Sequence, residues 1–277
     1  LRNLQALIGV RYIYHENFKN HATPNVALMY KPGKFNFRAS YAAGFRTPTL
    51  SELYATDIAK KNDRLTIGNL DLKPEKNDYF SLSAEYVHER FSVSVNAFYN
   101  NIRDMIDYNT IATGDKAMEQ YGHKEVRQRD NIAEAKVHGI NVSANAYLGA
   151  GFNLSGGYTH LNTQDVELEQ PIDKSIKNAY NINAQWAHSW KIYRLNINLN
   201  GRFNSKRFSK SYGYAPEYQL WDLNTRHSFN LKSVIIEPGC GMENLFDYMD
   251  DRPYNSNYAT LTPGRSFYIS LSLKFKS

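Results

Sequence analysis

The chain has 277 residues, 42% of them hydrophobic, and a formal net charge of +6, which allows one large domain or two small ones. Its mean hydropathy is polar at -0.59, and no apolar run approaches the roughly 20 residues of a membrane helix, which excludes a helical membrane protein but not a barrel of strands. Lys and Arg are scattered, which argues against a nucleic-acid partner, and the single cysteine, Cys240, excludes an internal disulfide.

Apolar and polar residues alternate in most segments, a pattern typical of strands whose two faces meet different surroundings. In KIYRLNINLNGRF (191–203), every second residue from Tyr193 to Leu199 is apolar, and arginine or asparagine stands between them. Helical spacing is found in SELYATDIAKK (51–61), for which we expect a short helix. We expect about twelve strands, near residues 4–14, 25–31, 34–43, 79–87, 90–107, 130–148, 151–162, 177–188, 191–204, 219–230, 233–246 and 265–275. The chain is therefore predicted to be all-β.

The links between these strands alternate in length. After the even-numbered strands stand the short turns KPGK, VHER, LGAG, HSWK and NLKS. The links after the odd-numbered strands are long, from about ten residues for the first to roughly 35 for residues 44–78. Outer-membrane barrels have short periplasmic turns at one end and long external loops at the other. A soluble sandwich has no reason to keep its two ends so different.

The composition of the two strand faces indicates the same architecture. The polar face favours Asn, Ser, Gln, Arg and Tyr, which suits a hydrated lumen better than the surface of a soluble sandwich. Aromatic residues gather near strand ends, as in the girdles at the two membrane interfaces. These residues include Tyr12, Tyr14, Phe98, Tyr99, Tyr158, Trp186, Trp190 and Trp221. The predicted fold is a transmembrane antiparallel β-barrel.

Three stretches carry motifs of one known family. The first is SYAAGFRTPTLSELY (40–54), followed by GNLDLKPEK (68–76). The second is FYNNIRDMIDY (98–108), followed by NIAEAKVHGINVSANAYL (131–148). The third, GMENLFDYMDDRPYNSNYATLTPGRSFYISLSLKF (241–275), ends in a turn and an alternating strand. In this order the stretches resemble the TonB-dependent outer-membrane receptors.

This resemblance implies a barrel of roughly 22 strands around a plugged lumen, of which residues 1–277 would supply about twelve as the C-terminal portion. The earlier strands, the N-terminal plug and the TonB-contacting segment are not in this sequence, so we expect the chain to be part of a larger polypeptide or assembly. The implied location is the outer membrane of a Gram-negative cell, in contact with lipid and lipopolysaccharide. The implied activity is uptake of a scarce ligand, foremost a ferric siderophore or related iron complex, with energy from the TonB–ExbB–ExbD system.

No catalytic constellation stands out in the sequence. The patterns HxxxH, HExxH, CxxC, GxSxG and the phosphate loop are all missing, so we expect no enzyme activity, no cofactor and no metal site. The histidines are dispersed: His15 and His21 fall in the first long loop, and His123 falls in the loop after the fifth strand. For the histidines on or near strands, we expect structural roles.

The candidate ligand-binding residues lie in the predicted external loops, including 109–129 and 205–218. Aromatic side chains combined with cations suit a flat or anionic ligand, such as a ferric chelate or the propionates of heme. The candidates are Arg46, Tyr54, Met118, Tyr121, His123, Arg127, Arg207, Tyr212 and Tyr214. Two structural alternatives stay open. Arg46 can instead pair with carboxylates or carbonyls at the barrel rim, and the loops can be basic because they meet anionic lipopolysaccharide.

Other ligands and functions also stay open. Heme receptors of this family usually carry a histidine between the two motifs of the first stretch, and none occurs from Thr47 to Ile67, although His123 can substitute. The FRTP…GNLDLKPE…IRDMIDY run is also similar to the corrinoid receptors, which keeps vitamin B12 among the candidates. A passive porin or adhesin barrel and a secreted carbohydrate-binding β-domain are the alternatives from other functional classes.

Overall fold

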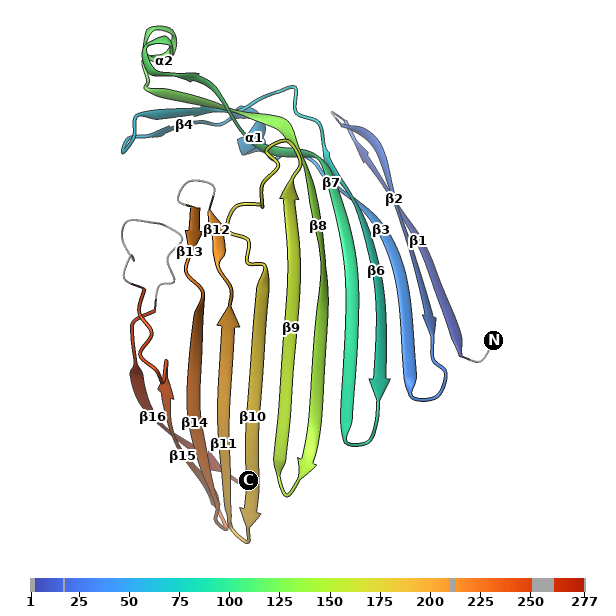
Figure 1. Ribbon diagram of the computed structural model, residues 1–277, viewed down its shortest axis with the longest axis vertical. Coiled ribbons are helices and arrows are strands. Elements are labelled where there is room, and N and C mark those ends of the chain that lie inside the picture. Colours follow the sequence, from blue (N-terminus) through green and yellow to red (C-terminus); the bar gives the residue numbers. More distant parts are fainter. Residues whose placement is uncertain (1–2, 17, 210–212, 251–261, 277) are drawn as a thin grey trace.

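In the computed structural model, which describes residues 3–16, 18–209, 213–250 and 262–276, the chain forms one large curved sheet (Figure 1). Twelve of the described strands follow one another in chain order across it, from β1 at one edge to β16 at the other. The neighbouring strands along this path are antiparallel. The predicted all-β fold and its strand count are therefore confirmed. Among the described residues, no helix combines the length and the apolar character that a membrane-spanning helix needs.

We call these twelve strands the wall. They are β1 (Leu4–His15), β2 (Lys19–Tyr30), β3 (Phe35–Arg46), β6 (Glu75–Val87), β7 (Phe91–Thr113), β8 (Glu125–Gly149), β9 (Phe152–Asp165), β10 (Asn178–Trp190), β11 (Tyr193–Asn204), β14 (Tyr218–Asn230), β15 (Val234–Glu243) and β16 (Ser266–Phe275). The elements outside the wall are α1 (Leu50–Tyr54), β4 (Thr56–Ala59), β5 (Arg64–Ile67), α2 (Gly114–Tyr121), β12 (Arg207–Ser209) and β13 (Gly213–Ala215). All of them lie at the upper end of the wall in Figure 1.

The two ends of the wall differ as the sequence predicts. At the lower end, the links are tight turns, and they comprise residues 31–34, 88–90, 150–151, 191–192 and 231–233. At the upper end, the links contain the two helices and the four short strands. This asymmetry matches a barrel wall with periplasmic turns below and external loops above.

Two predicted external loops are more regular than expected. The first loop is short, because β1 continues to His15 and β2 already begins at Lys19, with Tyr12 and Ala22 paired between them. His21 consequently lies in β2 and not in a loop. The segment 109–129 is also largely strand, because β7 and β8 extend upward around α2.

The helix predicted over residues 51–61 is wrong in its second half. The helix α1 ends at Tyr54, and the next residue, Ala55, is already extended with φ −70° and ψ 140°. The chain then forms β4, which pairs with β5 from Thr56↔Ile67 to Ala59↔Arg64. Pairing with a distant strand overrides the helical spacing here, as tertiary context commonly does.

The outer face of the wall carries the apolar members of the alternation. In the register between β10, β11 and β14, Leu199 lies opposite Ala184 and Leu223, while Asn200 lies opposite Asn183 and Asp222. The closing strand β16 behaves likewise, and its apolar residue Ile269 is 89% exposed. Such exposure of an apolar face fits a surface that meets lipid.

Aromatic side chains on this outer face form two rows. The upper row contains Tyr41, Phe80, Tyr99, Tyr158, Tyr180 and Phe203, and the lower row contains Phe35, Tyr86, Phe91, Phe152, Trp186, Trp190, Tyr193 and Phe229. Along β11 the rows are ten residues apart, from Tyr193 to Phe203, which corresponds to roughly 25 Å across a membrane for a tilted strand. That height is typical of the apolar band of a membrane barrel. Phe98 is an exception among the predicted girdle residues, because its register partners Ser81 and Gly139 place it on the luminal face.

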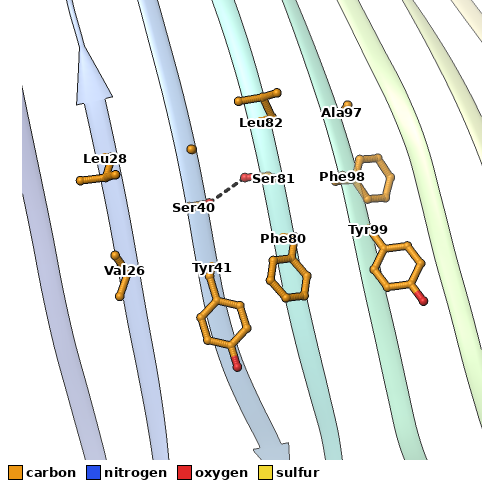
Figure 2. A pocket seen from close by; sticks show the side chains of 11 residues that line it. Val26, Leu28, Ser40, Tyr41, Phe80, Ser81, Leu82, Ala97, Phe98 and Tyr99 are labelled. Atoms are coloured by element: carbon orange, nitrogen blue, oxygen red, sulfur yellow. Dashed lines mark hydrogen bonds between the residues drawn. The ribbon is translucent and has the colours of Figure 1, made fainter.

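An apolar groove of about 510 Å³ lies on the outer face of β2, β3, β6 and β7. Figure 2 shows Val26 and Leu28 on one side, Tyr41 and Phe80 in the middle, and Tyr99 on the other side. The groove lies on the apolar outer face, where Tyr41, Phe80 and Tyr99 of the upper aromatic row line it together with Leu28, Leu82 and other apolar side chains below that row. We therefore assign it to contact with lipid chains and not to a ligand that arrives from water.

Substitution of Gly139 by alanine is expected to destabilise the wall by about 1–2 kcal/mol, as overpacking commonly does. A Cβ atom at this position would lie 2.2 Å from the backbone oxygen of His160 on β9, so β8 and β9 must move apart locally. The denaturant concentration at which the folded band on a gel converts into the unfolded band, compared with the parent, measures the loss of stability. Gly156→Ala on β9 is the matched control, because its backbone is not in the left-handed region and a Cβ atom there would lie no closer than 3.2 Å to its nearest neighbour, the Asn181 carbonyl oxygen; an equal effect of both substitutions would contradict the steric explanation.

Candidate functional site

The upper end of the wall carries a connected group of elements, which we call the external platform: α1, β4, β5, α2 and the outer ends of β7 and β8 (Figure 1). Residues 64–67 of β5 pair in parallel with residues 125–128 of β8. This pairing joins the loop between β3 and β6 to the loop between β7 and β8. Two clusters of buried apolar side chains hold the platform together, one around Leu53 and one around Val126.

Arg46, at the outer end of β3, is held by two carboxylates. Its guanidinium donates to Glu75 from Nε at 2.8 Å and from Nη2 at 2.6 Å, and to Glu52 from Nη1 at 2.9 Å and from Nη2 at 3.1 Å. Glu52 also closes a capping box with Thr49 at the start of α1. The two motifs of the first stretch in the sequence therefore meet in one ion network. Arg46 therefore pairs with carboxylates at the rim, which is the structural alternative raised by the sequence. This geometry gives no evidence that Arg46 contacts a ligand.

The charges of this network are strongly stabilised. Burial raises the pKa of Glu52, but the hydrogen bonds from Arg46 and Thr49 outweigh it and lower the pKa to about 2. For Glu75, burial acts in the same upward direction, and the hydrogen bonds from Arg46 and the Ile106 backbone leave the pKa below its ordinary value. The same carboxylates, Glu75 before Glu52, raise the pKa of Arg46. The network stays ionised at any physiological pH.

We expect the contribution of Glu52 to platform stability to survive mild acid. Because its pKa is lowered on folding, this contribution is fully present above the ordinary value of 4.5 and is lost only as the pH falls toward about 2. The Thr49 amide donates to Glu52 at 2.8 Å. Its hydrogen-exchange protection, corrected for the pH dependence of intrinsic exchange, measures the contribution of Glu52 to platform stability. Glu52→Gln is the reference that should show no such pH dependence. Complete loss of protection already near pH 4.5 would contradict the assignment.

Glu75 extends the network to a third segment. Its Oε1 accepts the backbone N–H of Ile106 on β7 at 2.8 Å, where the β7–β8 register shifts. Nearby, the Asn131 side chain accepts from the Lys73 N–H at 2.7 Å and donates to the carbonyls of Lys73 at 2.9 Å and Asp104 at 2.6 Å. The side chains of Glu75 and Asn131 thus bind the segment that leads into β6 to the outer ends of β7 and β8.

A glycine in the second motif allows close packing of the platform against α1. A Cβ atom on Gly68 would lie 2.5 Å from the backbone oxygen of Leu53. The Gly68 N–H donates to the Ala55 carbonyl at 2.8 Å, and the Asn69 N–H donates to the Glu52 carbonyl at 3.0 Å. These bonds satisfy carbonyls at the end of the short helix, which otherwise lack intrahelical partners.

His123 lies at the tip of the platform and pairs with Asp63. Its Nδ1 is 2.8 Å from Asp63 Oδ1, and the Lys124 N–H donates to the Asp63 carbonyl at 3.1 Å. The hydrogen bond with His123 lowers the pKa of Asp63. The pair fixes the β4–β5 turn to the link after α2, so the observed role of His123 is to join two loops.

The other candidate residues are spread over the upper end. Arg127 pairs with Glu125 at 2.5 Å, and Tyr121 packs against the cluster around Val126. The exposed candidates are Tyr54, Met118 and Tyr214, at 64%, 45% and 57% exposure. Arg207 lies on β12 with a buried Nη2 atom that has no hydrogen-bond partner among the described residues, and Tyr212 lies outside them. The platform brings together Arg46, Tyr54, Met118, Tyr121, His123 and Arg127, while Arg207 and Tyr214 belong to the separate β12–β13 hairpin.

Sequence reasoning missed a cation–aromatic contact on this platform. The Arg129 guanidinium carbon lies 3.6 Å from the centre of the Tyr108 ring, across the β7–β8 pair. Both residues stand on the external extensions of β7 and β8, just outside the predicted strands 90–107 and 130–148. The contact depends on the β7–β8 register, which shifts between Ile102 and Ile106, and the alternation within one strand does not give that register. Among the described residues, no group of three or more His, Cys, Asp or Glu side chains gathers to hold a metal ion.

Comparison with a protein-family model gives a match over most of the chain. The matched family is described as TonB dependent receptor-like, beta-barrel, and the match covers residues 1–245. It includes the wall from β1 to β15 and the external platform. The sequence features and the observed strand order thus agree with a single family of barrels.

Solved structures show the same fold at low sequence identity. A variant of the ferric enterobactin receptor PfeA from Pseudomonas aeruginosa is 19% identical with a TM-score of 0.78, over 100% of this chain and 43% of that chain. The siderophore receptor PirA from Acinetobacter baumannii is 16% identical with a TM-score of 0.76, over 100% and 44%. The copper transporter OprC is 14% identical with a TM-score of 0.69, over 91% and 39%. This chain therefore spans less than half the length of the proteins whose fold it shares.

Proposed function

Because this chain belongs to the family of TonB-dependent receptors, whose barrel model matches residues 1–245, we propose that it is the C-terminal part of an outer-membrane importer. Residues 1–277 form a section of the barrel wall, and the rest of the wall and a plug belong to the same polypeptide. The importer binds a scarce ligand at its external loops. TonB, with ExbB and ExbD, supplies the energy that moves the plug and lets the ligand pass.

The observation that carries this proposal is the external platform. It consists of several loop segments tied by ion pairs, hydrogen bonds and two small apolar clusters, so it is built as a rigid surface. A passive pore needs no such surface above its wall. The polar luminal face, with residues such as Asn183, Asn200 and Asp222 around a groove of about 510 Å³, supports a hydrated interior. The family and its structural relatives are transport receptors and not enzymes.

We propose a ferric siderophore or related iron complex as the ligand. Two of the structures with the same fold are described as a ferric enterobactin receptor and a siderophore receptor, which supports this class over heme and vitamin B12. Exposed aromatic and sulfur side chains of the upper end, Tyr54, Met118 and Tyr214, offer apolar contact to such a chelate. Arg207 on the β12–β13 hairpin offers a positive charge to an anionic chelate, and its buried Nη2 atom has no partner within the described part of the chain. Arg127, Tyr121, His123 and Arg46 shape the surface beside them.

The test is growth of a strain that lacks the whole gene, under iron limitation, on one iron source at a time. We expect loss of growth on one class of ferric siderophore and normal growth on heme. Complementation with the intact gene restores growth, and complementation in a strain without TonB does not. If growth on heme, or growth on vitamin B12 in a corrinoid-dependent test, requires the gene, then that compound and not a siderophore is the ligand. Growth that depends on the gene but not on TonB would support the passive barrel instead.

A further inference from the structure

Two histidines on the outer face of the wall are directed at one point. His138 on β8 and His160 on β9 belong to neighbouring strands, where His138 lies opposite Asn162 and Ile140 lies opposite His160. The Asn162 Nδ2 atom is 3.4 Å from His138 Nε2 and 3.2 Å from His160 Nε2. The two Nε2 atoms therefore both lie within hydrogen-bond distance of one amide nitrogen. Spacing along the sequence does not reveal this pair, because it is a diagonal pair across a strand ladder.

Hydrogen bonds settle which nitrogen of His160 is free to act as a ligand. Asn178 Oδ1 lies 2.8 Å from His160 Nδ1 and accepts a second bond from the Tyr158 hydroxyl at 2.9 Å. An amide oxygen accepts only, so Nδ1 of neutral His160 carries the proton and its Nε2 presents a lone pair. The Asn162 amide, as a donor, requires a lone pair on His138 Nε2 as well. With the Asn162 and Asn178 amides in these orientations, both Nε2 atoms present a lone pair to a metal ion.

A buried or half-buried imidazole whose other nitrogen donates to a carbonyl oxygen is the arrangement that orients metal-ligating histidines in proteins. Asn178 fills this role for His160. Metal–nitrogen bonds to histidine are about 2.0–2.1 Å long, so each ring must move on the order of 1 Å toward the position that the Asn162 nitrogen occupies. His138 is exposed, while His160 and Asn162 are half-buried, so the adjustment requires rotation of all three side chains.

The pair lies at the upper edge of the apolar band. In the register, His138 is opposite Tyr99, and His160 stands two residues above Tyr158, which both belong to the upper aromatic row. At this depth the outer face meets the membrane interface and not the hydrocarbon core. Water or a phosphate oxygen is available there to complete the coordination of a metal ion.

We propose that His138 and His160 form a binding site for a divalent transition-metal ion on the outer wall. Two imidazole ligands select late first-row ions, and the stability order favours Cu²⁺ over Ni²⁺ and Zn²⁺. The protein supplies two ligands and leaves the other positions open, so the site is exchangeable and differs from a closed structural site. A bound ion links β8 to β9 just below the external platform. The site is separate from the residues proposed to contact the imported ligand.

The test uses the intact receptor in detergent and CuSO₄ as the probe, with isothermal titration and electron paramagnetic resonance. We expect one copper site whose spectrum shows coupling to two imidazole nitrogens. His138→Gln and His160→Gln should each remove this site. Asn178→Leu should weaken it by roughly 10–100-fold, the usual effect of losing a partner of a ligating histidine. Asn162→Ala should leave it intact or strengthen it, because the amide competes for the two lone pairs.

The matched control is His227→Gln on the lower half of the wall, where His227 is bound to the Tyr193 hydroxyl at 2.7 Å. This variant should bind copper like the parent. Folding of each variant is checked by the gel shift between folded and heated protein. The proposal is overturned if both His138→Gln and His160→Gln bind copper as the parent does, or if the spectrum shows fewer than two imidazole nitrogens in the parent.

Discussion

An arginine in place of Leu199 is expected to lower the free energy of unfolding of the intact barrel in lipid by about 2–4 kcal/mol. Leu199 stands between the two aromatic rows on the outer face of β11, opposite Ala184 and Leu223. A guanidinium at this depth faces hydrocarbon and loses its hydration, which is the physical reason for the cost. Unfolding in urea, with the receptor refolded into vesicles, measures the difference from the parent.

The control for this substitution is the next residue of the same strand. Asn200→Arg places the same side chain on the luminal face, opposite Asp222 and beside a polar groove of about 510 Å³. We expect a cost below about 1 kcal/mol, because the charge is hydrated and has a carboxylate nearby. Equal costs at the two positions would show that the faces of β11 do not meet different surroundings.

Alanine in place of Glu75 is expected to open the external platform, with a local loss of stability of about 1–3 kcal/mol, mostly from the orphaned Ile106 N–H because the ion pair with Arg46 is partly exposed. Glu75 connects the end of β3 to β7 through Arg46 and the Ile106 N–H. Its removal leaves the buried N–H without an acceptor and Arg46 with one carboxylate instead of two. Limited proteolysis within residues 47–74 and hydrogen exchange at Ile106 measure the opening.

Glu85→Ala is the matched control, because Glu85 lies on the same strand pair and accepts from Asn36 at 3.0 Å near the opposite end. Its loss should leave proteolysis of the platform unchanged. Equal protection of the platform in the parent and in Glu75→Ala would contradict the role assigned to Glu75. We also expect ligand capture to weaken in Glu75→Ala when the platform, as proposed, carries part of the binding surface.

Most of the wall is predictable from the sequence because a strand between lipid and a lumen must alternate. The segment from Tyr193 to Leu199 shows this directly, and the short turns show which strand ends meet at the lower rim. The alternation is weaker above the membrane, where both faces are wet. For this reason, the upward extensions of β7 and β8 and the short first loop were not predictable in the same way.

The platform depends on contacts between segments that are distant in the sequence. The parallel pairing of β5 with β8, the His123–Asp63 pair and the Glu75–Ile106 bond each join two different loops. No local periodicity encodes them. The motifs did indicate that Arg46 lies at a rim with carboxylate partners, but they did not reveal that both partners, Glu52 and Glu75, come from the motifs themselves. Contact of any candidate residue with a ligand stays a prediction.

The central claim is that one face of this sheet meets lipid and the other meets an aqueous lumen. Spin labels placed one at a time at positions 195–200 of β11, after Cys240→Ser in the intact receptor in vesicles, test it most directly. We predict that labels at 195, 197 and 199 collide more with oxygen, and that labels at 196, 198 and 200 collide more with a water-soluble nickel complex. Uniform access of the nickel complex to all six positions, or the opposite alternation, would contradict the account.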